Sequence, residues 1–127
     1  MWVLNKQNAA KLDIWERKIL RKILGGVNEE GIGWRRRTNQ EVMELYNNPS
    51  VSHVVRVQRL RWLGHVIRME ESRLEKKVLT MGEGGKKKRG RPKRKWMEGV
   101  KEDMLRLGVK NWKEKAEDRS KWRKILK

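Results

Sequence analysis

Residues 50–69, SVSHVVRVQRLRWLGHVIRM, decide the fold class of this chain. Apolar residues recur there every three or four positions, which is the period of an amphipathic α-helix, at Val51, Val54, Val55, Leu60, Leu63, Val66 and Ile67. Ser50 or Ser52 is the expected N-cap, because a serine hydroxyl can accept a hydrogen bond from a free first-turn amide. Gly64 costs about 1 kcal/mol relative to alanine inside a helix, so it predicts the close approach of another element.

The segments on either side repeat the helical pattern. A first helix is expected over 8–24, ended by two glycines, with an apolar stripe at Leu12, Trp15, Ile19 and Ile23 that Leu20 and Leu24 widen. A short second helix should follow Thr38, which has capping-box spacing to Glu41, and end at residues 47–49. Further helices are expected over 73–81, 95–107 and 111–126, and the glycine-rich segment 27–37 is expected to be a loop. The sequence predicts an all-α fold of five or six amphipathic helices in a loose array, with no sheet.

Core positions in the last two helices follow from the same spacing. The core-facing set is Trp96, Val100, Met104 and Leu107 in one helix, and Trp112, Ala116, Trp122 and Leu126 in the other. Trp15 and Trp62 are also expected in the core. Glu16 is expected to be solvated, and Asp118 with Arg119 to form an exposed charge pair of little consequence for stability.

The composition shifts sharply after residue 81. GEGG over 82–85 is followed by KKKRGRPKRK over 86–95, where no packed core can form. We therefore expect three parts: an N-terminal helical segment over 1–81, a disordered basic linker over 82–95, and a C-terminal helical hairpin over 96–127. Because the linker gives the two helical parts little reason to dock, their mutual packing should be loose.

The charge balance restricts the classes of partner. The 127 residues contain 34 Lys and Arg against 16 Asp and Glu, a net charge of +18, and such an excess favours association with a polyanion. No apolar run approaches the roughly 18 residues of a membrane span, and the N-terminus does not resemble a signal peptide. Cysteine is absent, which excludes disulfides and zinc knuckles. We expect nucleic acid as the partner, no membrane, and a nuclear or cytoplasmic ribonucleoprotein location without secretion.

Cations next to tryptophans, together with the basic run, are the candidate nucleic-acid contacts. Arginine and lysine neutralise phosphates, and an exposed aromatic ring can stack on an unpaired base. The candidates are Trp34, Arg35, Arg36, Arg37, Arg56, Arg59, Lys86, Lys87, Lys88, Arg89, Arg91, Lys93, Arg94 and Lys95. Arg56, Arg59 and Arg68 are expected on an outward helix face, and Arg61 also lies beside a tryptophan.

The basic run admits three interpretations. Its centre, Arg89-Gly90-Arg91-Pro92, resembles an AT-hook, and a narrow A·T minor groove attracts inserted arginine. A nuclear localisation signal fits the same residues. The third interpretation is a solvated linker without any partner.

No constellation for catalysis or metal binding is evident. His53 and His65 lie twelve residues apart with no cysteine or carboxylate at ligand spacing, so no metal or cofactor is expected. Two-metal phosphoryl transfer needs converging carboxylates, whereas Asp13, Asp103 and Asp118 lie in three different predicted helices. The chain alone is predicted not to be an enzyme.

Several stretches resemble a known family when taken in order. They are residues 16–25, ERKILRKILG; RRTN at 36–39 leading to ELY at 44–46; RLRWLGHVIRM at 59–69; RGRP at 89–92 with Trp96 close behind; and Trp112, Ala116, Asp118-Arg119 and Trp122-Arg123 near the end. This order resembles the C-terminal region of the endonuclease–reverse transcriptases of non-LTR retrotransposons, particularly RTE-like elements. The resemblance covers nearly the whole chain, and the succession from RLRWLGHV to RGRP is its most specific part.

The resemblance implies a region that holds template RNA or target DNA beside an RNA-directed DNA polymerase. The chain departs from the full family protein, because it lacks the Tyr-X-Asp-Asp motif of the palm, with Tyr46 followed by two asparagines, and lacks an endonuclease domain. A truncated fragment is therefore implied, with the missing polymerase portion as a possible partner.

Three interpretations follow from different classes. The first is a nucleic-acid-binding fragment of a retrotransposon reverse transcriptase. The second is a structural remnant of a transposable element, without function, whose apolar faces lack their original partner. The third is a basic helical module that binds an acidic protein or a membrane surface, with the membrane version disfavoured by the glycine-rich interruption.

Overall fold

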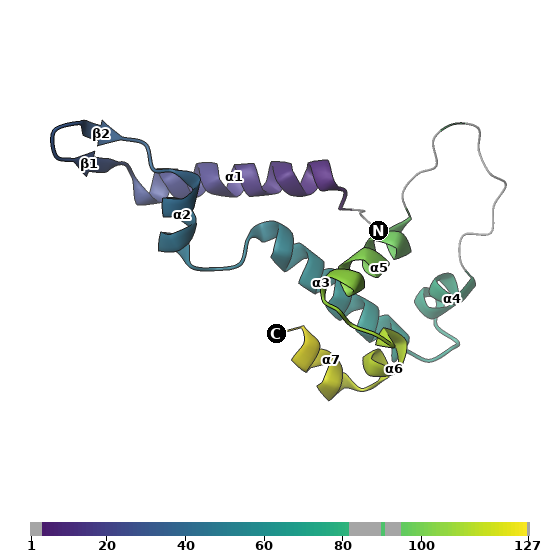
Figure 1. Cartoon of the computed structure of the whole chain (residues 1–127). Helices are drawn as coiled ribbons and strands as arrows, with labels where there is room; N and C mark the ends of the chain where they lie inside the picture. The colour runs from purple at the N-terminus through teal and green to yellow at the C-terminus, as the bar shows by residue number, and fades with distance from the viewer. Residues whose placement is uncertain (1–3, 82–89, 91–94, 127) are drawn as a thin grey trace. The chain divides into compact units, whose positions relative to one another are not determined.

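The computed structural model describes residues 4–81, 90 and 95–126 (Figure 1). Within them lie seven helices and one hairpin, in the order α1 (Lys6–Leu24), β1 (Val27–Glu29), β2 (Gly33–Arg35), α2 (Asn39–Tyr46), α3 (Val51–Ile67), α4 (Leu74–Met81), α5 (Trp96–Arg106), α6 (Trp112–Glu117) and α7 (Arg119–Ile125). The mainly helical fold is confirmed, and the expected absence of a sheet is wrong. The described residues form two compact units, an N-terminal unit over 4–55 and a C-terminal unit over 56–126.

In the N-terminal unit, α1 has a defined cap at each end. The side chain of Asn5 accepts a hydrogen bond from the Asn8 backbone N–H at 2.7 Å. At the other end, Gly25 adopts φ 67° and its N–H donates to the Arg21 carbonyl. The combination of φ 67° with ψ −167° is essentially restricted to glycine, so the expected end of this helix at Leu24 is confirmed.

The buried face of α1 agrees with the predicted stripe at Leu20 and differs from it elsewhere. Ala9, Glu16 and Leu20 are buried, whereas Trp15 is 57% and Ile23 is 74% exposed. The helix packs against α2, where Val42 is fully buried (Figure 1). The expectation that Trp15 lies in the core is therefore wrong, because the single short helix α2 covers only part of the surface of α1.

Carboxylates of α1 cap the start of α3. Glu16 accepts a hydrogen bond from the Val51 N–H at 3.1 Å. Asp13 accepts from the Ser52 N–H at 3.4 Å and from its hydroxyl at 3.1 Å. The first amides of a helix have no intrahelical partner, so these contacts satisfy two of them. The expectation of a solvated Glu16 is wrong for this reason.

The segment expected to be a loop contains an antiparallel hairpin. Val27 pairs with Arg35, Asn28 with Trp34 and Glu29 with Gly33. Gly31 and Gly33 take positive φ values of 83° and 89°, which permits the tight reversal. Strands of three residues are too short to display a period-two pattern, so the sequence signal indicated only a glycine-rich turn.

The capping box before α2 is confirmed. The Glu41 N–H donates to the Thr38 hydroxyl at 3.3 Å, and the Thr38 N–H donates to the Glu41 carboxylate at 2.7 Å. Asn47 ends the helix in the left-handed conformation with φ 46°, as asparagine tolerates. Ser50 precedes α3 and its hydroxyl accepts from the His53 N–H at 3.4 Å.

The C-terminal unit has one apolar core that joins α3 to the last three helices. Its buried members are Leu60, Leu63, Val100, Met104, Ala116, Trp122 and Leu126. Residues 96–126 therefore pack against the second half of α3, and the expected loose packing across the basic segment is wrong. The expected division into 1–81 and 96–127 does not match the two compact units. Leu107 is 43% exposed and lies outside this core, also against expectation.

Two positions in this unit explain its local geometry. At Gly64 a Cβ would overlap the indole of Trp122, so the predicted close approach is confirmed, with a side chain as the neighbour. Asp118 divides the helix that was expected over 111–126 into α6 and α7. Its carboxylate accepts hydrogen bonds from the Ser120 and Lys121 N–H groups at 2.8 and 3.1 Å. Asp118 is therefore the N-cap of α7, whereas the sequence predicted only an exposed charge pair with Arg119.

Candidate nucleic-acid interface

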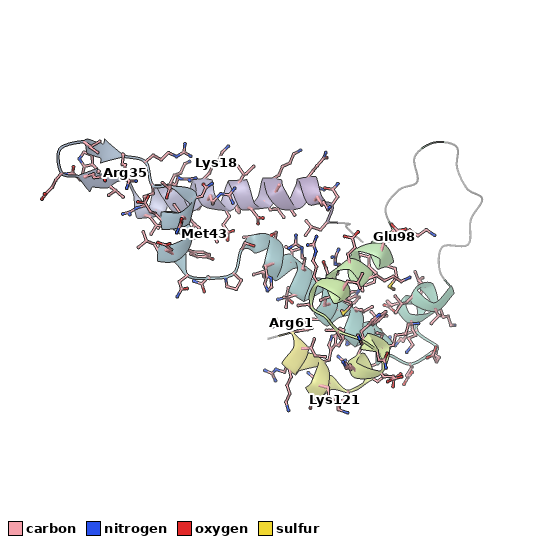
Figure 2. The ribbon with its side chains drawn as sticks, in the orientation of Figure 1. Lys18, Arg35, Met43, Arg61, Glu98 and Lys121 are labelled. Atoms are coloured by element: carbon pink, nitrogen blue, oxygen red, sulfur yellow. The ribbon has the colours of Figure 1, made fainter. Side chains whose placement is uncertain are left out.

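A cationic groove lies on the N-terminal unit beside the hairpin. It has a volume of about 420 Å³ and combines two apolar side chains of α1 with four cations, and its described lining residues include no carboxylate. We call it the α1 groove, and its lining is Trp15, Lys18, Ile19, Arg21, Lys22 and Arg36. Lys18 projects from α1 in Figure 2. The ring of Trp15 is more than half exposed, so a flat aromatic ligand can reach it.

Of the three consecutive arginines, Arg35 is neutralised within the protein. Its Nε lies 2.5 Å from Glu29 Oε2, and its two Nη atoms lie 3.0 and 2.7 Å from the Glu41 carboxylate. Hydrogen bonds from Arg35 are the largest cause that lowers the pKa of Glu41 to about 2, followed by the backbone N–H of Thr38. The same contacts, first with Glu41 and then with Glu29, raise the pKa of Arg35. Arg35 therefore fixes the hairpin to α2.

The other two arginines differ in their surroundings. Arg36 is exposed and lines the α1 groove. Arg37 is half-buried, and its carbonyl accepts a hydrogen bond from Arg21 Nε at 3.0 Å. Arg21 also donates to the Asn39 side chain at 2.5 Å, which holds its guanidinium in place at the edge of the groove. Of this predicted triplet, Arg36 is the member best placed for a ligand.

Trp34 is the most exposed of the tryptophans that the structure describes. It lies on β2 opposite Asn28 and is 77% exposed. Burying an aromatic ring is favourable. The exposed ring of Trp34, two residues before Arg36, is therefore suited to stack on a base. The predicted role of Trp34 as a stacking surface remains a prediction, and its position permits it.

Arg56 and Arg59 lie in the C-terminal unit, where both are near Asp103 and neither is fully exposed. Arg59 pairs with Asp103 and donates to the Gly99 carbonyl at 3.2 Å, with 8% of its side chain exposed. Arg56 is half-buried, with Nε 4.0 Å from Asp103. The expectation of an outward-facing Arg59 is wrong, because a buried carboxylate needs a charged partner.

The basic run falls largely outside the described residues. The candidate contacts that lie outside the described residues are Lys86, Lys87, Lys88, Arg89, Arg91, Lys93 and Arg94. Lys95 is described: it is exposed and immediately precedes α5, and its N–H donates to Glu98 at 3.2 Å. The candidate role of the run therefore rests on its sequence.

Each aspartate of the chain has a structural partner. Asp13 binds Ser52, Asp103 pairs with Arg59, and Asp118 caps α7. Among residues 4–81, 90 and 95–126, no three His, Asp or Glu side chains gather as a metal site would require. In the same part of the chain no helix has the length and apolar character needed to cross a membrane.

Sequence reasoning did not single out Trp15, Lys18 and Lys22 as a site. The signal that identifies them is an aromatic residue with cations three and seven positions later, which places all three on one helix face. That spacing is also typical of a solvated helix, so only the nearby Arg36 distinguishes the groove. Comparisons of the chain with protein-family models, curated proteins and solved structures find no match.

Proposed function

We propose that this protein binds nucleic acid, mainly through phosphates, and that the α1 groove is one of its contact surfaces. The observation that carries the proposal is the groove itself: four cations around an exposed indole, with no carboxylate in the lining. Cations displace condensed counterions from phosphates, and aromatic rings stack on bases without regard to sequence. The net charge of +18 supports the same partner.

Paired charge variants on α1 test the α1 groove. Replacing Lys18 and Lys22 with glutamine should weaken binding to a labelled oligonucleotide more than replacing Lys6 and Lys11, which are exposed on the same helix but lie outside the groove. Both variants lose two charges, so general attraction falls equally in both. Equal affinities of the two variants in fluorescence anisotropy would contradict a role for the α1 groove.

We further propose that the chain itself catalyses no phosphoryl transfer. The structural partners of its three aspartates support this, because a carboxylate engaged in a cap or a buried ion pair is not free to hold a metal. The purified protein should extend no primer and nick no plasmid with Mg²⁺ or Mn²⁺. Metal-dependent activity that copurifies with the chain through stringent steps would contradict the proposal.

The origin that the sequence resemblance suggests is part of this proposal. We propose a C-terminal fragment of a non-LTR retrotransposon reverse transcriptase, located in the nucleus or in a cytoplasmic ribonucleoprotein. Exposed apolar residues on α1, including Ile14 and Ile23, support the polymerase portion of the parent protein as a second partner. Addition of that portion should protect the amides of α1 from hydrogen exchange, whereas unchanged protection would contradict this partner.

A further inference from the structure

A second cationic groove lies in the C-terminal unit, between α3 and α7. Its volume is about 620 Å³, and no carboxylate is found among its described lining residues. Arg61 contributes from α3, Arg68 from the position directly after α3, and Arg119 and Arg123 from α7. We call it the arginine groove. Arg61 is labelled in Figure 2.

The charge of this groove is not compensated within the described part of the chain. Arg61, Arg119 and Arg123 are exposed, and no acidic side chain described in the structure pairs with them. Asp118, the neighbour of Arg119, is engaged instead as the cap of α7 and lies 3.5 Å from Lys121. Like charges held together repel one another, so this arrangement favours an anionic ligand.

The fourth arginine is held in position. Arg68 Nη1 donates to the Ala116 carbonyl at 2.5 Å, and this contact between the residue that follows α3 and the end of α6 fixes a guanidinium plane at the groove. A guanidinium that is already ordered loses less conformational freedom when it binds a phosphate or stacks on a base. Arg68 therefore offers a ligand a cation whose position is already fixed by its hydrogen bond to Ala116.

Aromatic and apolar surface accompanies the cations. Trp122 and Leu126 line the groove from the core, but at 3% and 5% exposure they offer a ligand little surface. His65 lines the groove, and its ring lies 5.5 Å from that of the partly exposed Trp62 at an angle of 52°. Phosphate contacts on a rim with flat rings beside it are the arrangement that binds unpaired nucleotides.

The size of the groove suits unpaired nucleotides better than a duplex. A cavity of a few hundred cubic ångströms holds a ligand of small-molecule size, which corresponds to one or two nucleotides. Bases of a duplex reach such a cavity only after unpairing and unstacking, at a free-energy cost. We propose that the arginine groove binds unpaired nucleotides of single-stranded DNA or RNA. This rests on the proposed nucleic-acid-binding function and names the form of substrate taken at this second surface.

The test compares two triple variants of the full chain with equal loss of charge. One replaces Arg61, Arg119 and Arg123 with glutamine; the control replaces Arg73, Lys101 and Arg106, which are exposed in the same unit and lie outside the groove. Arg68 is left in place because it contacts Ala116. Circular dichroism should show equal helix content in both, since all six side chains are on the surface.

Affinities are measured for labelled strands of about 12 nucleotides as single-stranded DNA, single-stranded RNA and duplex, with polyglutamate as a protein-like polyanion. The groove variant should bind single strands about tenfold more weakly than the control, while both lose equal affinity for duplex. Equal losses on single strands, or polyglutamate bound as tightly as the strands, would overturn the arginine-groove proposal alone. A parent chain that binds no nucleic acid would overturn the proposed function as well.

Discussion

Gly64 and Trp122 show how one residue can set the distance between two helices. The Trp122 indole N–H donates to the Leu60 carbonyl at 3.0 Å inside the core, and this places the ring directly over Gly64. A polar N–H that is buried needs such a partner. The absence of a side chain at position 64 therefore allows the large ring to be buried with its hydrogen bond intact.

Gly64→Ala should destabilise the protein by about 1–3 kcal/mol, because the added methyl overpacks a core contact. The sign is informative, since helix propensity alone favours alanine by about 1 kcal/mol. Gln58→Ala, at an exposed position of the same helix, is the control for alanine in α3 away from the core. Urea unfolding in which the two variants are equally stable would contradict the packing account.

The Arg35–Glu41 pair makes the stability of the N-terminal unit depend on pH. The pKa of Glu41 lies at about 2, below its ordinary value of 4.5, chiefly because of the hydrogen bonds from Arg35. A depressed pKa in the folded state means that the stabilisation is present above about pH 4.5 and is lost as the pH falls towards 2. Thermal melts of Glu41→Gln should fall below those of the parent protein at pH 7, and the difference should close by pH 2. A difference independent of pH would show that the carboxylate charge has no role.

At the scale of single elements, helices with marked caps could be predicted from the sequence and short elements could not. Asn47 and the Thr38–Glu41 box bound α2 as expected, and Gly25 ends α1. These signals are local, because each depends on residues within one turn. The hairpin of three-residue strands and the break at Asp118 gave no periodic signal. The exposure of Trp15 and Ile23 on α1 was not predicted either, since it depends on how much of the surface of α1 is covered by α2.

Asp118 is the residue that allows α7 to begin. Its pKa is lowered, first by the Lys121 backbone N–H, which indicates that the ionised carboxylate is the capping form. Asp118→Ala should lower the melting temperature by roughly 4 °C through loss of the cap, whereas Asp118→Asn should retain most of it, because asparagine caps about as well. Equal melting temperatures of all three proteins in calorimetry would mean that the break between α6 and α7 is set by packing instead.

For the whole molecule, the class of partner stays a prediction from composition, and the location of the contacts depends on the fold. Net charge and basic runs are properties of composition, so they need no fold. Which cations pair with carboxylates depends on the tertiary structure: Arg35 and Arg59 do, while Arg36, Arg61 and Arg123 have no carboxylate partner among the residues that the structure describes. The core shared by α3 and α5–α7 was not predicted either, because helix periodicity shows which face is buried but not against which helix.

The salt dependence of duplex DNA binding tests the central claim, phosphate-driven binding of nucleic acid, most directly. If about five to eight phosphates are neutralised, the logarithm of the binding constant should fall against the logarithm of salt concentration with a slope of about −4 to −7. A variant with alanine at Lys86, Lys87, Lys88, Arg89, Arg91 and Lys93 should lose several units of that slope. Steep dependence in the parent protein with a shallower slope in the variant is the predicted result. A slope near zero in the parent protein would contradict the account.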